Sequence, residues 1–529
     1  MALRLCLLLG VLLASTASAA TVDPSVVSGS GSASVPVSTV SAAVAAAASA
    51  VDMQDGCIHF QIVHSNNAQH FTKRAVELSL ANRSDVAYYA KLEFGTPPQA
   101  QYVQLDTGSF ELWVNPTCSS AGGLSSGDAN FCQAVGRFEP SASSTFTSLN
   151  VGKQLRYGIG TANITYVTDD ISLPGTSSVL SQVQFGVATV TQDEFSGILG
   201  IGYGLGLTTR YPNFVDELAM QNVTRVKAFS LALGSKAEQE GVIVFGGVDT
   251  SKFAGQLERL PITPAKFSPD GVPRYWVNMT SLGLTPAGPG GTPKTYPNSK
   301  LQVFLDSGST LTLLPSDLAN AIAADFGAAA ANSDGFYAVD CRLAATAGGS
   351  LDFTFGGTTV RVPYSELIRQ SGSTCMLGLQ ASTDFVLLGD TFLRSAYVVI
   401  DQSDNVVWMA QYANCGSTPA ALASAASLST LTGVCTAANS LELSSGASAS
   451  ASATASTAAG TAPARTATSA ATPKPGTTSS SSSDSGATTS PAAAASDSAP
   501  TASVSRRRVY VVAGSVVAAM LGSSMLDWL

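Results

Sequence analysis

Short runs of β-forming residues, broken by Gly, Pro, Asn and Asp, fill the chain from about residue 84 to residue 415. Tyr88 to Phe94 and Tyr397 to Ile400 are examples, and such runs between turn residues are typical of β-strands. Helical spacing of apolar residues occurs from Phe214 to Met220 and from Ser316, an expected N-cap, to Gly327. The pattern predicts a mostly-β body with a few short helices.

The two ends of the chain differ from this body. Residues 1–20 combine a charged residue, an apolar stretch and small residues, which predicts a cleaved secretory signal peptide. Residues 416–508 are rich in Ser, Thr and Ala, so we expect a disordered, O-glycosylated stalk. The apolar residues 509–529 fit a GPI signal with attachment at Ser498. A transmembrane anchor and an inefficient signal that leaves the protein secreted stay open beside that expectation.

Residues 21–74 have the features of a pro-segment. Their first part is rich in Ala, Ser, Val and Thr without a period, a composition that does not order by itself. Cys57 to His64 then alternates like a half-buried strand. Lys73 and Arg74 follow as a dibasic pair, which predicts a processing site in front of the mature protein.

Composition excludes several classes of function. Charged residues make up only 12% of the chain and the formal net charge is -9, so an anionic nucleic acid would be repelled. The only histidines, His59, His64 and His70, lie in the predicted pro-segment. The body therefore has no histidine for a Ser-His-Asp triad, a Cys-His pair or an imidazole-bound metal. We expect neither a metal nor a cofactor.

Cysteines and glycosylation sequons fit passage through the secretory pathway. In an oxidising compartment, Cys118 with Cys132 and Cys341 with Cys375 are expected to form one disulfide in each half of the body. The pairing of Cys57, Cys415 and Cys435 stays open, with Cys415 and Cys435 as one possible pair. Four asparagines occur in the sequence Asn-x-Ser/Thr, namely Asn82, Asn163, Asn222 and Asn278.

One seven-residue pattern occurs twice. Val103 to Ser109 is matched by Val303 to Ser309, and each copy has Asp, a hydroxyl residue, Gly and Ser at its end. Two aliphatic residues and a glycine follow about 80 to 90 residues later in both cases, at Ile198 to Gly200 and at Leu387 to Gly389. The repeat implies two related halves of the body.

The repeated motif carries the candidate chemistry. Asp106 and Asp306 each stand on a tight turn after an apolar strand, and an isolated Asp-x-Gly would most often be only a turn. Two carboxyl groups in contact share one proton, so one can draw a proton from water while the other donates to a carbonyl oxygen. The glycines permit close approach and the hydroxyls can hold the carboxylates. These supporting residues are Thr107, Gly108, Ser109, Ser307, Gly308 and Ser309.

With these motifs the sequence resembles the pepsin-like aspartic endopeptidases from about Tyr88 to Tyr412. Besides the two aspartate motifs, the resemblance is carried by Phe94 to Gln99, Leu112 to Val114, Tyr157 to Gly160, Phe195 to Gly200, Phe245 to Asp249 and Leu388 to Arg394. The stalk and the apolar end are similar to the layout of fungal yapsin-like, surface-anchored members of the family.

The resemblance implies an all-β, bilobal fold with two pseudo-two-fold related lobes, residues 84–225 and 226–415. Asp106 and Asp306 would be the catalytic pair of an endopeptidase active at acidic pH. An extended polypeptide substrate would lie between the lobes of a monomer. The residues given further roles by the resemblance are Tyr157 as the flap tyrosine, Trp113 as its hydrogen-bond partner, and Phe195 and Ile198 as pocket wall.

Two alternatives remain beside this interpretation. An inactive pepsin-fold protein could serve as a binding or cell-wall glycoprotein, but inactive relatives typically lose an aspartate, its glycine or the flap tyrosine, and all are present here. Asp193 and Glu194 are interpreted as a solvated turn, with a preference for basic substrate side chains as the alternative. We therefore expect an active protease in the secretory pathway, at the cell surface or outside the cell.

Overall fold

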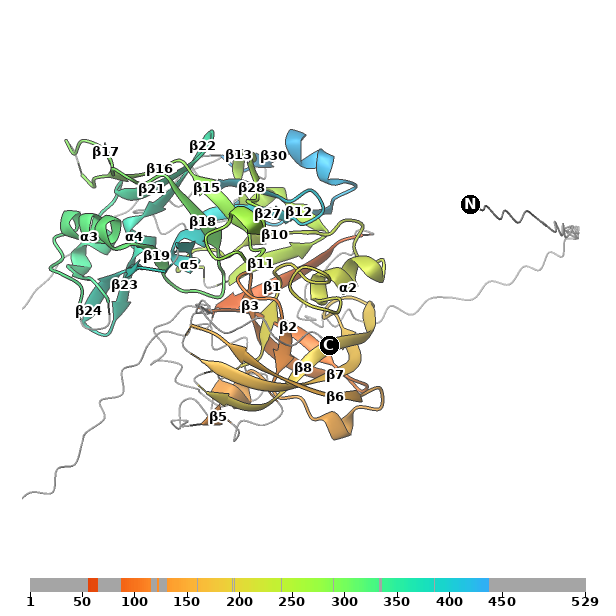
Figure 1. Ribbon diagram of the computed structural model, residues 1–529. Helices are drawn as coiled ribbons and strands as arrows, with labels where there is room; N and C mark the ends of the chain where they lie inside the picture. The colour runs from red at the N-terminus through yellow and green to blue at the C-terminus, as the bar shows by residue number, and fades with distance from the viewer. Residues whose placement is uncertain are drawn as a thin grey trace, which may run out of the picture. The chain divides into compact units, whose positions relative to one another are not determined.

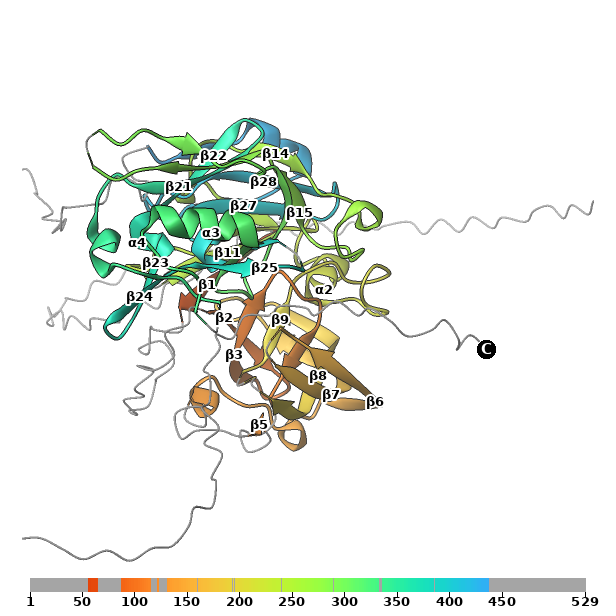
Figure 2. The same ribbon diagram turned by 60° about the vertical axis from the view of Figure 1, so that its left-hand side comes forward.

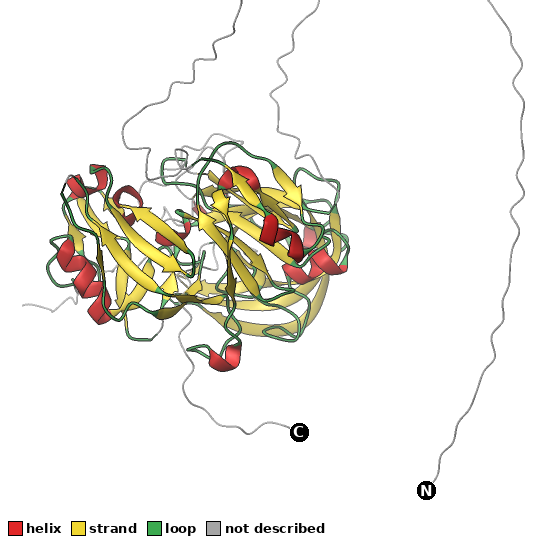
Figure 3. Cartoon of the chain, turned by 90° about the horizontal axis from the view of Figure 1, so that it is seen from above, coloured by secondary structure: helices red, strands yellow, loops and turns green. Residues whose placement is uncertain are grey.

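The computed structural model describes residues 56–64, 87–115, 121–122 and 131–436, apart from residues 159, 193, 195, 239, 289, 333, 334 and 385. Strands dominate this part of the chain and its helices are short, as Figure 3 shows. The predicted signal peptide, the dibasic pair and the tail after residue 436 lie outside the described residues. No helix in the described ranges is long and apolar enough to cross a membrane.

The largest element is a 14-stranded sheet that contains strands from both predicted halves. Thirteen strands follow one another across it, and β5 pairs with β8 beside them. In spatial order, with β5 last, the strands are β14 (Glu258–Pro261), β28 (Val406–Gln411), β27 (Ala396–Asp401), β10 (Ala228–Ala232), β11 (Glu240–Phe245), β1 (Ile58–His64), β2 (Tyr88–Phe94), β3 (Gln99–Asp106), β9 (Ile198–Gly200), β4 (Leu112–Val114), β8 (Val179–Gln192), β7 (Thr161–Ser172), β6 (Thr147–Arg156) and β5 (Ala121–Gly122).

The second half adds smaller sheets. The five-stranded one contains β15 (Trp276–Met279), β18 (Leu301–Leu305), β26 (Leu387–Leu388), β19 (Thr312–Pro315) and β25 (Leu379–Ser382). The four-stranded one contains β17 (Lys294–Thr295), β16 (Ser281–Thr285), β21 (Ser350–Phe355) and β22 (Thr358–Pro363). The other pairings are β20 (Ala338–Val339), β24 (Thr374–Leu377) and β23 (Ile368–Ser371) in one sheet, β12 (Gly247–Asp249) with β29 (Pro419–Ala421), and β13 (Ala254–Gln256) with β30 (Thr432–Val434).

The two predicted helices are present at the expected positions to within one residue, whereas α4 (Tyr364–Leu367) and α5 (Asp390–Leu393) were not predicted. A capping box at Asn213 starts one of them, because its side chain accepts from the Asp216 amide and that of Asp216 accepts in return. Ser316 is the first helical residue rather than the N-cap, which is Pro315. The helix that begins there packs against β25 (Figure 2). The helices whose two ends both lie within the described residues are α2 (Phe214–Met220), α3 (Ser316–Asp325), α4 (Tyr364–Leu367), α5 (Asp390–Leu393), and the 3-10 turns η2 (Pro140–Ala142), η3 (Thr250–Lys252), η4 (Ala265–Phe267), η5 (Cys341–Ala345) and η6 (Ala425–Thr430).

The strand expected in the predicted pro-segment is present and lies inside the large sheet. β1 pairs antiparallel with β11 on one side and with β2 on the other (Figure 1). Ile58, Phe60 and Ile62 are buried in the main apolar cluster, as the alternation predicts. Cys57, just before the strand, is a buried free thiol.

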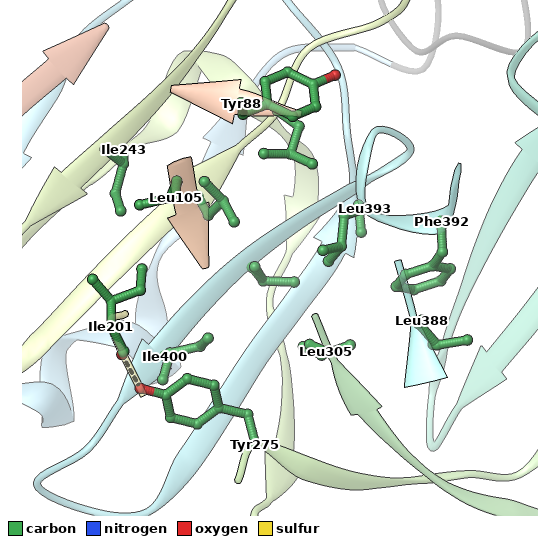
Figure 4. Packing of buried hydrophobic residues seen from close by; sticks show 14 of the residues in the cluster. Tyr88, Leu105, Ile201, Ile243, Tyr275, Leu305, Leu388, Phe392, Leu393 and Ile400 are labelled. Carbon is green, nitrogen blue, oxygen red and sulfur yellow. Dashed lines mark hydrogen bonds between the residues drawn. The ribbon is translucent and has the colours of Figure 1, made fainter. Parts of the chain in front are cut away.

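One apolar cluster joins the two halves of the body around the ends of the repeated motif. Leu105 and Leu305 both belong to it, together with Ile400 and Tyr275 (Figure 4). The Tyr275 hydroxyl donates to the Ile201 carbonyl at 2.5 Å, so the polar end of the ring is satisfied inside the core. Complete burial of one such aliphatic side chain contributes about 1.5 to 3 kcal/mol, so the strand ends are held firmly.

The predicted start of the disordered stalk at residue 416 is wrong. Residues 416–436 fold onto the body, because β29 pairs with β12 and β30 pairs with β13. Leu422 and Leu428 are buried, and Cys435 forms a disulfide with Cys415. A few apolar anchors and one disulfide therefore order a stretch whose composition alone favours disorder.

Candidate active site

The two predicted aspartates lie at equivalent places in the two halves. Asp106 is the last residue of β3, which runs parallel to β9, and Asp306 directly follows β18, which runs parallel to β26. β9 and β26 contain the aliphatic pairs that accompany each motif in the sequence. Both aspartates are completely buried. The internal repeat thus corresponds to two copies of one strand arrangement.

Reciprocal hydrogen bonds hold the two turns together. The Thr107 hydroxyl donates to the Leu305 carbonyl at 2.9 Å, and the Ser307 hydroxyl donates to the Leu105 carbonyl at 3.0 Å. Each hydroxyl also accepts from the opposite backbone amide, at 2.9 Å for the Ser307 amide and 3.1 Å for the Thr107 amide. The second residue of each motif therefore locks the other half in place.

The glycines bring the carboxyl groups together. A Cβ on Gly108 would overlap Oδ1 of Asp306, and a Cβ on Gly308 would overlap Oδ1 of Asp106. Each glycine amide also donates to the aspartate of its own motif, at 2.8 Å to Asp106 and 3.0 Å to Asp306. No larger residue fits at either position without moving a carboxyl group.

Burial and charge favour a shared proton. Burial raises the pKa of Asp306 well above its usual range, and the neighbouring Asp106 carboxylate raises it further. The Ser309 hydroxyl donates to Asp306 Oδ2 at 2.8 Å, and this hydrogen bond lowers the pKa of Asp306. Two carboxyl groups in this position lose their first proton readily and their second with difficulty.

The flap pair also meets as expected. Tyr157 lies in the turn that connects β6 to β7, where its amide donates to the Gly160 carbonyl at 2.8 Å. The Trp113 indole Nε1 donates to the Tyr157 hydroxyl at 2.6 Å. Burial raises the pKa of Tyr157 well above its usual range, and the charges of Glu194 and Asp106 add to this effect. The hydroxyl therefore stays protonated.

The predicted pocket wall is only partly described. Ile198 is buried in one apolar cluster with Trp113 and Tyr157, while Phe195 lies outside the described residues. The expectation that Glu194 lies in a solvated turn is wrong, because its residue is only 5% exposed. Its carboxylate packs where a Cβ on Gly160 would lie.

The remaining predicted sites are disulfides, glycosylation sequons, the processing site and the anchor attachment site. The disulfide between Cys341 and Cys375 is present, and Cys132 is disulfide-bonded. The three sequon asparagines that are described, Asn163, Asn222 and Asn278, are exposed. The predicted sites outside the described residues are Cys118, Lys73, Arg74, Asn82 and Ser498.

Sequence reasoning missed three residues near the pair. Gln104 and Arg274 donate to the carbonyls of the two motif glycines, Gly308 and Gly108 respectively. Asp390 is completely buried, which raises its pKa well above the usual range, and the charge of Asp306 contributes. Gln104 and Asp390 lie inside motifs of the sequence, but nothing in those motifs marks their roles beside the pair, and Arg274 lies in no such motif.

Two buried aspartates that meet at the ends of equivalent strands of an all-β fold are the arrangement of an aspartic protease. The model of the eukaryotic aspartyl protease family matches residues 87–412. Candidapepsin-3 of Candida albicans is 34% identical over 359 residues, which cover 65% of this chain and 84% of the relative. Barrierpepsin of Saccharomyces cerevisiae is 31% identical over 371 residues, which cover 64% of this chain and 62% of the relative.

A solved structure agrees with this assignment at the level of the fold. The crystal structure of the aspartic proteinase from Irpex lacteus superposes with a TM-score of 0.50 at 22% sequence identity, covering 67% of this chain and 98% of that one. The chain therefore belongs to the eukaryotic aspartyl protease family and is an aspartic-type endopeptidase. The resemblance to pepsin-like enzymes and the all-β fold expected from the sequence are both confirmed.

Proposed function

We propose that the protein hydrolyses peptide bonds at acidic pH with a water molecule activated between Asp106 and Asp306. The observation that carries the proposal is the reciprocal packing of each carboxyl group against the glycine of the opposite motif. Since the pKa of Asp306 is raised by burial and by Asp106, the pair holds a single proton over an acidic range.

The chemistry follows from this shared proton. The charged carboxylate takes a proton from the water as it attacks the substrate carbonyl carbon. The protonated carboxyl group donates to the carbonyl oxygen, so charge does not build up there. The carboxyl group that took the water proton then passes it to the leaving amine as the carbon–nitrogen bond breaks. The other carboxylate takes a proton back from a hydroxyl of the tetrahedral intermediate, so the pair again holds one proton. Tyr157, held by Trp113, would lie over an extended polypeptide bound beside the pair.

Asparagine substitutions test this mechanism. An amide is close in size to a carboxyl group but cannot exchange the proton, so Asp106→Asn and Asp306→Asn should fold and lose at least about 10³-fold in kcat/KM. Hydrolysis of a peptide library at pH 2 to 7 measures the activity, and circular dichroism checks the fold. Near-wild-type turnover by either variant would reject the mechanism. A wild-type protein that binds peptides without cleaving them would instead favour the inactive glycoprotein.

We also propose that the protein is secreted and held at the cell surface by a GPI anchor attached at Ser498. The similarity to secreted aspartic protease 3 of Candida albicans supports the secretory route. Ser-rich sequence, a polar spacer and the apolar residues 509–529 support the anchor. Phosphatidylinositol-specific phospholipase should release the protease from intact cells. Retention together with an epitope at Trp528 would show a transmembrane anchor.

A further inference from the structure

The carbonyl groups of the two motif glycines are held by different donors. The Gln104 side-chain amide, from β3, donates to the Gly308 carbonyl at 3.2 Å. In the repeated pattern, position 104 corresponds to Phe304, which has no donor to offer the Gly108 carbonyl. Arg274 provides that donor instead, through Nη1. One turn is therefore secured by a neutral amide and the other by a cation.

Arg274 is built into this position from several sides. It is 2% exposed, and its guanidinium carbon lies 5.2 Å from the centre of the Phe110 ring and 5.3 Å from that of Phe304. Its Nε donates to Asp270 Oδ2 at 2.7 Å. The Trp276 indole donates to the other oxygen of Asp270 at 3.2 Å, which fixes that carboxylate. Aromatic faces attract a guanidinium group, and the ion pair orients it.

We propose that Arg274 is a positioning residue that holds the first catalytic turn and sets the electrostatic potential at the aspartate pair. The inference rests on the proposed function of that pair. The hydrogen bond from Arg274 fixes the peptide group that contains the Gly108 carbonyl. The preceding peptide group contains the Gly108 amide, which donates to Asp106. A buried cation also stabilises negative charge nearby more strongly than it would in water.

The direction in which Arg274 changes the pKa of the pair follows from its positive charge. The charge of Arg274 lowers the pKa of Asp306, against the stronger effects of burial and Asp106. Gln104 has no charge and cannot act in this way. Loss of the Arg274 charge should therefore move both limbs of the pH profile to higher pH.

The experiment compares kcat/KM from pH 2 to 7 for full-length wild type, Arg274→Gln, Arg274→Lys and Gln104→Met. Arg274→Gln should shift both limbs of the pH profile to higher pH. Arg274→Lys keeps the charge, so the limbs should stay at the same pH while kcat/KM is lower. Gln104→Met removes the equivalent neutral donor and is the matched control. Its kcat/KM should be lower, and the limbs of its pH profile should stay at the wild-type pH. Limbs of Arg274→Gln that coincide with those of wild type, or an equal shift in Gln104→Met, would overturn the proposal.

A second variant covers the case in which Arg274→Gln does not fold. Asp270→Asn removes the anion that partly neutralises Arg274, so both limbs should move to lower pH; unmoved limbs would reject the electrostatic role. Asp306→Asn is measured beside these variants. Hydrolysis that survives in Asp306→Asn would refute the proposed function itself, which is a different result from a missing pH shift.

Discussion

His64 is expected to make the position of β1 sensitive to pH. It is the last residue of the strand that lies between β2 and β11, and it is only 2% exposed. Its ring packs edge-on against Tyr88 with 5.3 Å between centroids. Arg394, one of the cations that act on His64, is paired with Glu366 at 2.6 Å. The cations whose charges act on His64 are Lys236, Arg369 and Arg394.

The magnitude follows from the pKa. Burial, followed by the three cations, lowers the pKa of His64 from 6.5 to about 3. A lowered pKa means that His64 is neutral in the folded state. Protonation therefore does not weaken the docking of β1 above pH 6.5, and docking weakens as the pH drops below that value. At pH 4 the difference is about 2.5 units, which corresponds to about 3 kcal/mol and a few-hundred-fold weaker docking of β1. Acid should therefore loosen this strand of the predicted pro-segment.

Hydrogen exchange of the peptide that contains β1 can measure this change. The background is Asp306→Asn, so that proteolysis does not interfere, and rates are corrected for intrinsic exchange at pH 7 and pH 4. The added substitution His64→Gln should preserve protection at pH 4, where the unsubstituted strand loses it. His59→Gln is the comparison on the same strand. Burial lowers the pKa of His59 too, with Asp249 raising it and Lys252 lowering it, so this substitution should preserve less protection than His64→Gln. Equal loss of protection with and without His64 would refute the reasoning.

Three further predictions concern the site and its support. Trp113→Phe removes the donor to the flap tyrosine, so steady-state kinetics should show kcat/KM lower by about 10-fold, the cost of roughly 1.4 kcal/mol for one buried hydrogen bond. Asp390→Asn should raise the melting temperature at pH 6 and leave it nearly unchanged at pH 3, because burial raises the pKa of Asp390 and its stabilising effect is lost as the pH rises. Thr107→Val and Ser307→Ala should each lower the free energy of unfolding by about 1 to 3 kcal/mol in urea titrations, and the double variant should lose less than the sum because the two share their bonds.

Local sequence patterns predicted that the two aspartates meet, because the two parts of the site are copies of one motif. The two copies share one pattern of strand and turn, so Asp106 and Asp306 could be placed at the ends of equivalent strands. The aliphatic pairs of β9 and β26 lie beside them for the same reason. Alternation likewise predicted β1, although one of its two neighbours, β11, comes from a distant part of the chain.

The errors arose where contacts between distant residues override composition. Residues 416–436 look disordered by composition, yet Leu428 is completely buried and β30 adds to β13. Arg274 belongs to no local pattern, and its role depends on Phe304 and Gly108, which lie far away in the sequence. Glu194 looks like a surface residue until the turn at Gly160 covers it.

The departures from symmetry explain how two equal motifs can act differently. The bonds of Thr107 and Ser307 are reciprocal and would leave two equivalent carboxyl groups. Arg274, by contrast, approaches from the second half only, and Asp390 lies near the pair without a counterpart in the repeat. The pseudo-symmetry provides no second copy of these charged or titratable groups. The two carboxyl groups that would share the proton therefore have different electrostatic surroundings. The symmetric backbone therefore brings the carboxyl groups together, and we expect the asymmetric side chains around it to determine how the proton is divided between them.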